Sequence, residues 1–219
     1  MDHFFRKSII AASGLFLCVF MLVHLSANCI LLLPEAISRD MYNTYSTVLR
    51  ESPLIKAVAY VLYLSIVLHI VYAAIVSYRN KKAKPTAYAM NRSQENSSWS
   101  SQNMGLLGML ILLFIVVHLA NFWARIKLGL GEIVATDTLG NLDVYKLTVQ
   151  LFKNPSYVFF YSILAIPLGF HLHHGFKSAF KSLGFYHQKG LKIVAQLSLI
   201  YAILIAVGFG IIPIIVFLK

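Results

Sequence analysis

Five long apolar segments follow one another along the chain, and short polar stretches separate them. They cover residues 8–33, 57–79, 104–128, 157–180 and 191–218. Each reaches the roughly 20 residues that a helix needs to cross a ~30 Å hydrocarbon core. None shows the apolar–polar alternation of a barrel strand, which favours helices. The pattern predicts an all-α integral membrane protein with five transmembrane helices in a single domain over residues 1–219.

Two of the polar stretches, residues 34–56 and 129–156, are long enough to hold short helices of their own. The segments SRDMYNTYSTVLRE, from Ser38, and NLDVYKLTVQLFK, from Asn141, have the pattern of such helices. A Ser or Asn directly before a helical pattern is a common N-cap. We therefore expect two interfacial helices on one side of the membrane, capped by Ser38 and Asn141.

Composition agrees with a membrane location. Hydrophobic residues make up 58% of the chain and charged residues 12%, which leaves too little polar surface for a soluble domain of this size. The formal net charge of +11 could indicate nucleic-acid binding, but the basic residues lie in short loops between apolar segments, as in membrane proteins. We expect no nucleic-acid partner.

The loop charges predict an orientation. The side with the N-terminus and the loops 79–103 and 177–192 carries eleven Lys and Arg residues against eight on the other side, and YRNKKAK is its densest cluster. Cytoplasmic loops carry the excess of Lys and Arg. The N-terminus is therefore expected in the cytoplasm and the C-terminus outside a multi-pass cytoplasmic (inner) membrane protein.

Most histidines lie inside the apolar segments, where ionisable residues are rare and usually serve a function. These residues are His24, His69, His118, His171, His173 and His174. A single membrane histidine is often only an interhelical hydrogen bond, but a histidine on each of four successive helices is harder to explain that way. No Asp or Glu lies within the spans to form a proton relay. Neutral imidazoles on facing helices suit haem iron better than zinc, which needs its ligands at one point.

The depths of the histidines indicate two sites. The first and third helices run outward and place His24 and His118 some 3–6 Å to the outer side of the middle of their spans. The second and fourth helices run inward and place His69 and His174 toward the cytoplasm. On the fourth helix the spacing alone leaves His171 and His174 both open, because residues three apart share a face. His173 fits an interhelical polar contact better.

With this arrangement of histidines, the chain resembles the di-haem cytochrome b subunit of succinate dehydrogenases and fumarate reductases, in its single-chain, five-helix type. The resemblance covers essentially the whole chain. It rests on GLFLCVFMLVHL with His24, LHIVYAAIVSYR with His69, FIVVHLANF with His118 and HHGFKSAFKSLG with His174, one on each of four helices, followed by a fifth helix without histidine.

The resemblance implies the fold and the cofactors. Helices one to four would form a haem-binding bundle, with the fifth helix peripheral. Two haems b would be bound, the distal one by His24 and His118 and the proximal one by His69 and His174. His174 fits the family's fourth ligand because a small and then an aromatic residue follow it. His171 is then an alternative ligand or part of the haem pocket.

The same resemblance implies a membrane anchor and electron conduit, surrounded by membrane lipid. A flavoprotein subunit and an iron–sulfur subunit would dock on its cytoplasmic face. Electrons would pass through the haems to or from menaquinone or another quinone, whose chemistry is expected at this subunit. The succinate–fumarate chemistry would belong to the flavoprotein, and the whole complex could form a dimer.

Two smaller groups of residues are further candidates. Glu51 and Glu35 are the outer-side carboxylates nearest the ends of the first two helices, which makes them candidates for the quinone site, although a solvated loop charge is the more common explanation for such residues. Lys177, Lys181 and Arg79 could contact haem propionates, or they could reach into the lipid headgroups.

Two other functions fit the pattern. One is a di-haem cytochrome b of another quinone-linked dehydrogenase, of the formate dehydrogenase or hydrogenase type, which co-purifying soluble subunits would identify. The other is a haem-free membrane transporter, for which broken helix pairs would be a sign. Only Pro167 and Pro213 interrupt the spans, which is weak support for a transporter.

Overall fold

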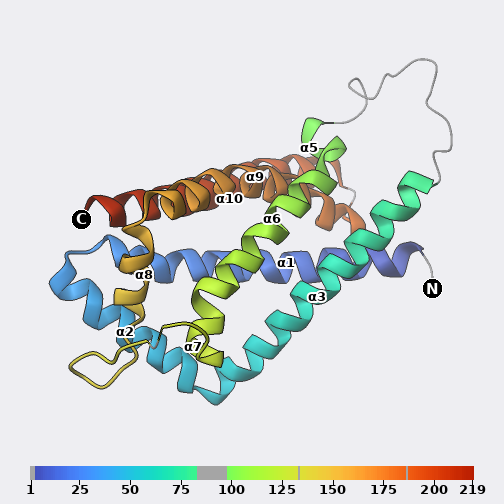
Figure 1. Cartoon of the computed structure of the whole chain (residues 1–219). Helices are drawn as coiled ribbons and strands as arrows, with labels where there is room; N and C mark the ends of the chain where they lie inside the picture. Colours follow the sequence, from blue (N-terminus) through green and yellow to red (C-terminus); the bar gives the residue numbers. More distant parts are fainter. Residues whose placement is uncertain (1–2, 83–97, 133, 186) are drawn as a thin grey trace.

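The computed structural model of the chain describes residues 3–82, 98–132, 134–185 and 187–219, and these residues form helices joined by loops (Figure 1). The helices are α1 (His3–Asn28), η1 (Cys29–Leu32), α2 (Glu35–Glu51), α3 (Pro53–Lys82), α5 (Trp99–Gln102), α6 (Met104–His118), η2 (Leu119–Trp123), α7 (Ala124–Leu128), α8 (Val144–Phe152), α9 (Pro155–Ser182) and α10 (Gln188–Leu218). Among them, η1 is a 3₁₀-helix and η2 is a π-helix.

The five predicted spans are confirmed as helices that are long and apolar enough to cross a membrane. They extend over Phe5–Leu32, Pro53–Lys82, Met104–Leu128, Pro155–Ser182 and Gln188–Leu218. The chain is therefore a multi-pass membrane protein, and its two ends lie at opposite ends of the bundle (Figure 1). Which membrane it occupies and which side holds the N-terminus stay predictions. Lys84 and Arg92, two of the charges behind that orientation, fall outside the described residues.

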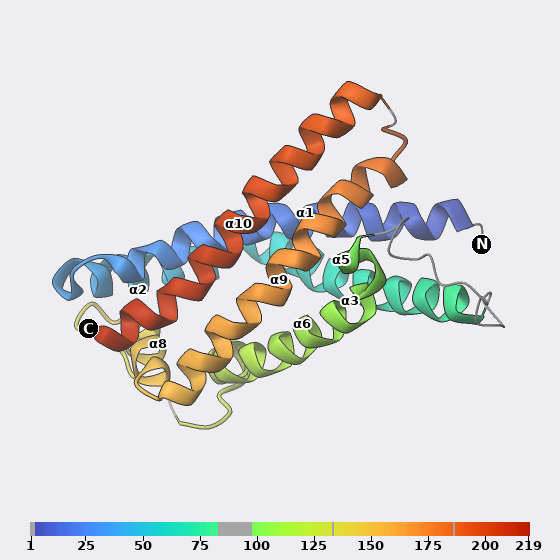
Figure 2. The ribbon, with the colours of Figure 1, turned by 90° about the horizontal axis from the view of Figure 1, so that it is seen from above.

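The fifth span packs closely on the fourth, and its place at the periphery of a haem-binding bundle stays a prediction. α10 runs beside α9 and crosses α1 (Figure 2), and its Ser198 and Ile205 are fully buried. Small residues permit the approach, since a Cβ on Gly169 of α9 would lie 2.9 Å from the Cβ of Ala206. α10 has no histidine, but its packing against α9 depends on small residues and not on histidine. The haem-binding bundle of the other four spans stays a prediction.

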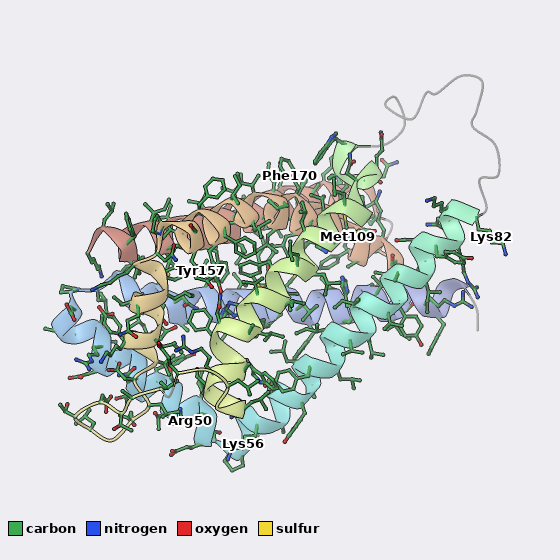
Figure 3. All side chains as sticks on the ribbon, viewed as in Figure 1. Arg50, Lys56, Lys82, Met109, Tyr157 and Phe170 are labelled. Atoms are coloured by element: carbon green, nitrogen blue, oxygen red, sulfur yellow. The ribbon has the colours of Figure 1, made fainter. Side chains whose placement is uncertain are left out.

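α3 turns its apolar residues outward. It contains no buried residue, and Leu54, Tyr60 and Leu64 are 72%, 73% and 58% exposed. In water a continuous apolar surface of this kind would be unfavourable, whereas lipid tails suit it. Figure 3 shows Lys56 near one end of α3 and Lys82 at the other, so charged residues bracket the apolar stretch.

A buried polar network joins α2 to α8. The side-chain nitrogen of Asn43, which is fully buried, donates to Asp137 Oδ2 and to Asp143 Oδ1, both at 3.0 Å. Its side-chain oxygen accepts from the backbone N–H of Tyr145 at 2.9 Å. Arg39, also on α2, forms an ion pair with Asp143. The network fixes the loop before α8 onto α2.

Both predicted interfacial helices exist, but both predicted N-caps are wrong. α2 begins directly after Pro34, so Ser38 lies inside the helix, fully buried, and donates to a backbone carbonyl of η1. Proline fixes φ near the helical value and starts the helix early. α8 is capped by Asp143, whose carboxylate accepts a backbone N–H of the first turn, and Asn141 lies in the preceding turn.

α2 has an inverted amphipathic pattern. Its polar Ser38 and Asn43 are buried against the protein, whereas Ile37, Met41 and Val48 are 53%, 46% and 60% exposed. A helix on a soluble protein would place these faces the other way round. An apolar face directed away from the protein suits a helix at the boundary of the lipid.

The carboxylates of this network stay ionised at low pH. Burial raises the pKa of Asp143, but hydrogen bonds from Arg39, Asn43 and the backbone N–H of Lys146 outweigh burial, so that the pKa lies below its ordinary value of 3.8. Burial also raises the pKa of Asp137. Hydrogen bonds from its own turn and from Asn43 outweigh burial and bring this pKa below 3.8 as well. The ionised forms therefore stabilise the folded state.

Replacing Asn43 by Ala should destabilise the protein, because Asp143 Oδ1 and the N–H of Tyr145 each lose a buried partner. We expect the free energy of unfolding to fall by about 2–3 kcal/mol, measured by thermal unfolding in detergent. Thr44→Ala, at the exposed neighbouring position, is the matched control and should change it by less than about 0.5 kcal/mol. Equal effects of the two substitutions would contradict the network.

Acid should weaken this end of the bundle. Because the folded-state pKa values of Asp143 and Asp137 lie below 3.8, their stabilisation is complete above that pH and is lost as the pH falls through the folded-state values. The protection factors of the α8 amides, corrected for the intrinsic pH dependence of exchange, should therefore fall below about pH 4. Asp143→Asn should flatten this pH dependence, and an unchanged profile in that variant would refute the assignment.

Candidate functional site

Two histidines from helices far apart in the sequence meet in the bundle. His24 on α1 and His118 at the end of α6 have ring centroids 5.9 Å apart and ring planes at 83°. We call them the first histidine pair. The sequence predicted that these two residues lie at one depth, and the structure places them side by side. Their role as ligands stays a prediction.

Aromatic side chains surround the first pair. Phe20 stacks on His24 at 5.2 Å, and Phe114 stacks on His118 at 5.6 Å. Other rings within about the same distance come from η2, α9 and α10 and are those of Phe122, Tyr161 and Phe209. The environment is apolar and would give a bound group a low local dielectric.

A second pair of histidines comes from α3 and α9. The ring centroids of His69 and His171 lie 6.2 Å apart with ring planes at 71°, and we call them the second histidine pair. Glycines of the two other helices face this pair. A Cβ on Gly14 of α1 would lie 3.2 Å from His69 Cε1, and a Cβ on Gly108 of α6 would lie 4.0 Å from His171 Cε1. The glycines leave room beside both rings.

The two pairs are separated along the bundle by the same distance on two helices. On α1, ten residues separate Gly14, beside the second pair, from His24 of the first pair. On α6, ten residues separate Gly108 from His118. At 1.5 Å per residue both separations are about 15 Å. The four rings therefore lie at two levels of the bundle, and their role as ligands stays a prediction.

The structure separates the three histidines of α9. His171 is the ring beside His69, although the sequence favoured His174 as the partner. His174 lies near the ammonium groups of Lys177 and Lys181 on its own helix. His173 makes the predicted interhelical contact, because its Nδ1 lies 3.0 Å from Ser198 Oγ of α10. Ligation by His174 is not tested by these contacts, but geometry brings His171 to the second pair.

The π-helix η2 begins directly after His118. π-helical turns are rare and occur frequently at functional sites. Two of its side chains form bonds to other helices: Asn121 Nδ2 donates to the Tyr161 hydroxyl at 3.1 Å, and Trp123 Nε1 donates to the Tyr63 hydroxyl at 3.0 Å. These bonds attach the chain after His118 to α9 and α3, which fixes the end of α6 in the bundle.

The candidate quinone and propionate residues lie apart from the pairs. Glu35 and Glu51 are exposed at opposite ends of α2, roughly 24 Å apart along the helix. Arg79 and Lys181 are exposed, and Lys177 is half-buried. The described contacts connect none of these five side chains with a histidine of either pair by a hydrogen bond or an ion pair.

A groove of about 420 Å³ lies along α2. Its lining consists of Ile30, Asp40, Met41, Thr44 and Tyr45. Asp40 supplies a carboxylate beside apolar and aromatic side chains, which suits an amphiphilic ligand. Asp40 lies four residues before Thr44 and Met41 four before Tyr45, so these side chains share one side of α2.

The geometry of each pair fits a haem iron. Two imidazoles on opposite sides of one metal have centroids about 6.2–6.4 Å apart, taking about 2.0–2.1 Å for each metal–nitrogen bond and about 1.1 Å from nitrogen to ring centre. The observed 5.9 and 6.2 Å lie within a few tenths of an ångström of this range. Each ring can rotate about its metal–nitrogen bond, so the large interplanar angles are compatible with ligation.

Unpartnered nitrogens also mark both pairs. His118 Nδ1 and His171 Nδ1 are buried and have no hydrogen-bond partner among the described residues. No group of three or more His, Cys, Asp or Glu side chains around one point is found in the described part of the chain. Pairs of neutral imidazoles suit haem, because the porphyrin supplies the other four ligands of its iron.

Comparisons of the chain with protein-family models, with curated proteins and with solved structures found no match. The chemistry of the two histidine pairs is therefore argued from their own geometry.

Proposed function

We propose that the chain is a di-haem cytochrome b that carries electrons across part of the membrane. Its axial ligands would be His24 and His118 for one haem, and His69 and His171 for the other. The observation that carries this proposal is the presence of two facing imidazole pairs, at 5.9 and 6.2 Å, about 15 Å apart along an apolar bundle. The sequence resemblance to di-haem cytochromes b, which rests on three of these four histidines, agrees with it.

The haem groups would supply reversible one-electron chemistry when bound. His24, His118, His69 and His171 would hold the two groups, and an iron ligated by two histidines would serve electron transfer rather than oxygen binding. The aromatic rings around His24 and His118 exclude water from the first pair. The spacing of the pairs on α1 and α6 is set by rigid helix geometry, so electron transfer needs no movement of the backbone.

We further propose His171, and not His174, as the fourth ligand. His171 faces His69, and its Nδ1 is buried without a partner in the described structure. His174 lies beside two ammonium groups, where a haem edge could place its propionates. Lys177 and Lys181 would then neutralise those carboxylates, with Arg79 as a further candidate.

The family resemblance supports a more specific role in a succinate:quinone oxidoreductase. In this role an iron–sulfur subunit and a flavoprotein bind the cytoplasmic face, and a quinone reacts within the membrane. Asp40 joins Glu35 and Glu51 as a candidate carboxylate for the quinone, because it lines a groove with Met41 and Tyr45. The subunits that co-purify with the chain will distinguish this complex from a formate dehydrogenase or hydrogenase.

Removal of one ligand should remove one haem. Alanine substitutions at His24, His118 or His69 should each lower the haem content from two to about one per chain, because the remaining imidazole cannot fill both axial positions. The measurement is the pyridine haemochrome assay on purified protein. His187→Ala is the matched control, since His187 lies at the N-cap of α10, away from both pairs. Retention of both haems by any of the three variants would remove that residue from the ligand set.

Alanine variants of the neighbouring histidines on α9 separate the two candidate fourth ligands. His171→Ala should retain one haem and His174→Ala should retain two, because only His171 faces His69. Absorption spectra of the reduced and oxidised variants give the answer directly. Loss of a haem from His174→Ala with both haems kept in His171→Ala would restore the ligand that the sequence favoured.

A further inference from the structure

Ser13 and Gly14 of α1 form a seat for the His69 ring. Ser13 is buried, and its Oγ lies 3.4 Å from His69 Nδ1. Gly14 passes the other edge of the ring so closely that an added Cβ would lie 3.2 Å from Cε1. The seat therefore combines a polar contact at one ring atom with close van der Waals contact at the next.

The direction of the hydrogen bond follows from the partners of Ser13. The hydroxyl has one hydrogen, and the oxygen lies 2.6 Å from the carbonyl oxygen of Ile9, with that of Ile10 at 3.3 Å. The short contact to Ile9 uses the hydrogen, which leaves lone pairs toward His69. His69 has two acceptors near it, the Ser13 oxygen at 3.4 Å from Nδ1 and the backbone carbonyl of Ile10, and both favour the tautomer with the ring hydrogen on Nδ1. Nε2 is left with its lone pair, which is the form that ligates a metal.

We propose that Ser13 is a positioning residue that fixes the tautomer of His69 and tunes the haem at the second histidine pair; the inference rests on the proposed function. A ligating histidine that donates its other N–H becomes a stronger electron donor. A stronger donor favours the oxidised iron and lowers its reduction potential. His171, the other ring of the second pair, lacks such an acceptor in the described structure, so within this pair the effect belongs to His69.

The test is a redox titration of the Ser13→Ala variant in a His118→Ala background, which should leave only the haem of the second pair. Ser26→Ala in the same background is the matched control. Ser26 lies on the same helix and donates to the carbonyl of Leu22, four residues back, at 2.9 Å, as Ser13 does to Ile9, but it is exposed. Ser13→Thr keeps a hydroxyl that can bond the same carbonyl.

Ser13→Ala should retain the haem and raise its potential, so that the ratio of reduced to oxidised haem at a fixed applied potential rises about three- to tenfold; a tenfold change is 59 mV for one electron. Ser26→Ala should leave the potential unchanged, and Ser13→Thr should restore it. An unshifted potential in Ser13→Ala, or the same shift in Ser13→Thr, would overturn the role of Ser13. Those results leave the cytochrome itself intact, whereas wild-type protein without haem would overturn the proposed function and this inference together.

Discussion

A polar ring nitrogen inside a lipid-embedded bundle needs a partner, because its transfer from water without a hydrogen bond or a metal costs about 2–7 kcal/mol in an apolar medium. Four spans of this chain carry histidines to which this constraint applies, and four of the rings lie in two pairs. His69 has the Ser13 hydroxyl beside its Nδ1, but His118 Nδ1 and His171 Nδ1 have no partner in the described structure. The arrangement of the other helices follows from bringing these rings together.

Small residues make that arrangement sterically feasible. Gly14 and Gly108 leave room beside the second histidine pair, and Gly169 lets α9 and α10 approach closely. α10 then covers the first pair from a third side through Phe209, whose ring lies 5.6 Å from that of His24. At the end of the bundle that holds the C-terminus, the Asn43 network holds α2 and the loop before α8 together. Close contacts at glycines and buried polar hydrogen bonds therefore hold different levels of the same bundle together.

The sequence predicted the five helices and the neighbourhood of His24 and His118, because both depend on regular spacing along a helix. It could not select between His171 and His174. These residues share a face, and the rotation of α9 depends on its packing against α10. That packing depends on the close approach of Gly169 and Ala206, which the spacing of apolar residues does not reveal. The role of Ser13 could not be predicted from the sequence, because serines whose hydroxyl bonds a backbone carbonyl of their own helix are common in membrane spans.

Haem stoichiometry of the wild-type chain tests the central claim most directly. The chain should be purified from cells supplied with haem, and its dithionite-reduced minus oxidised absorption spectrum recorded together with a chemical haem count. The account predicts two haems b per chain and a reduced spectrum that carbon monoxide does not change, because histidines fill both axial positions. Colourless protein that is folded and complete would contradict it.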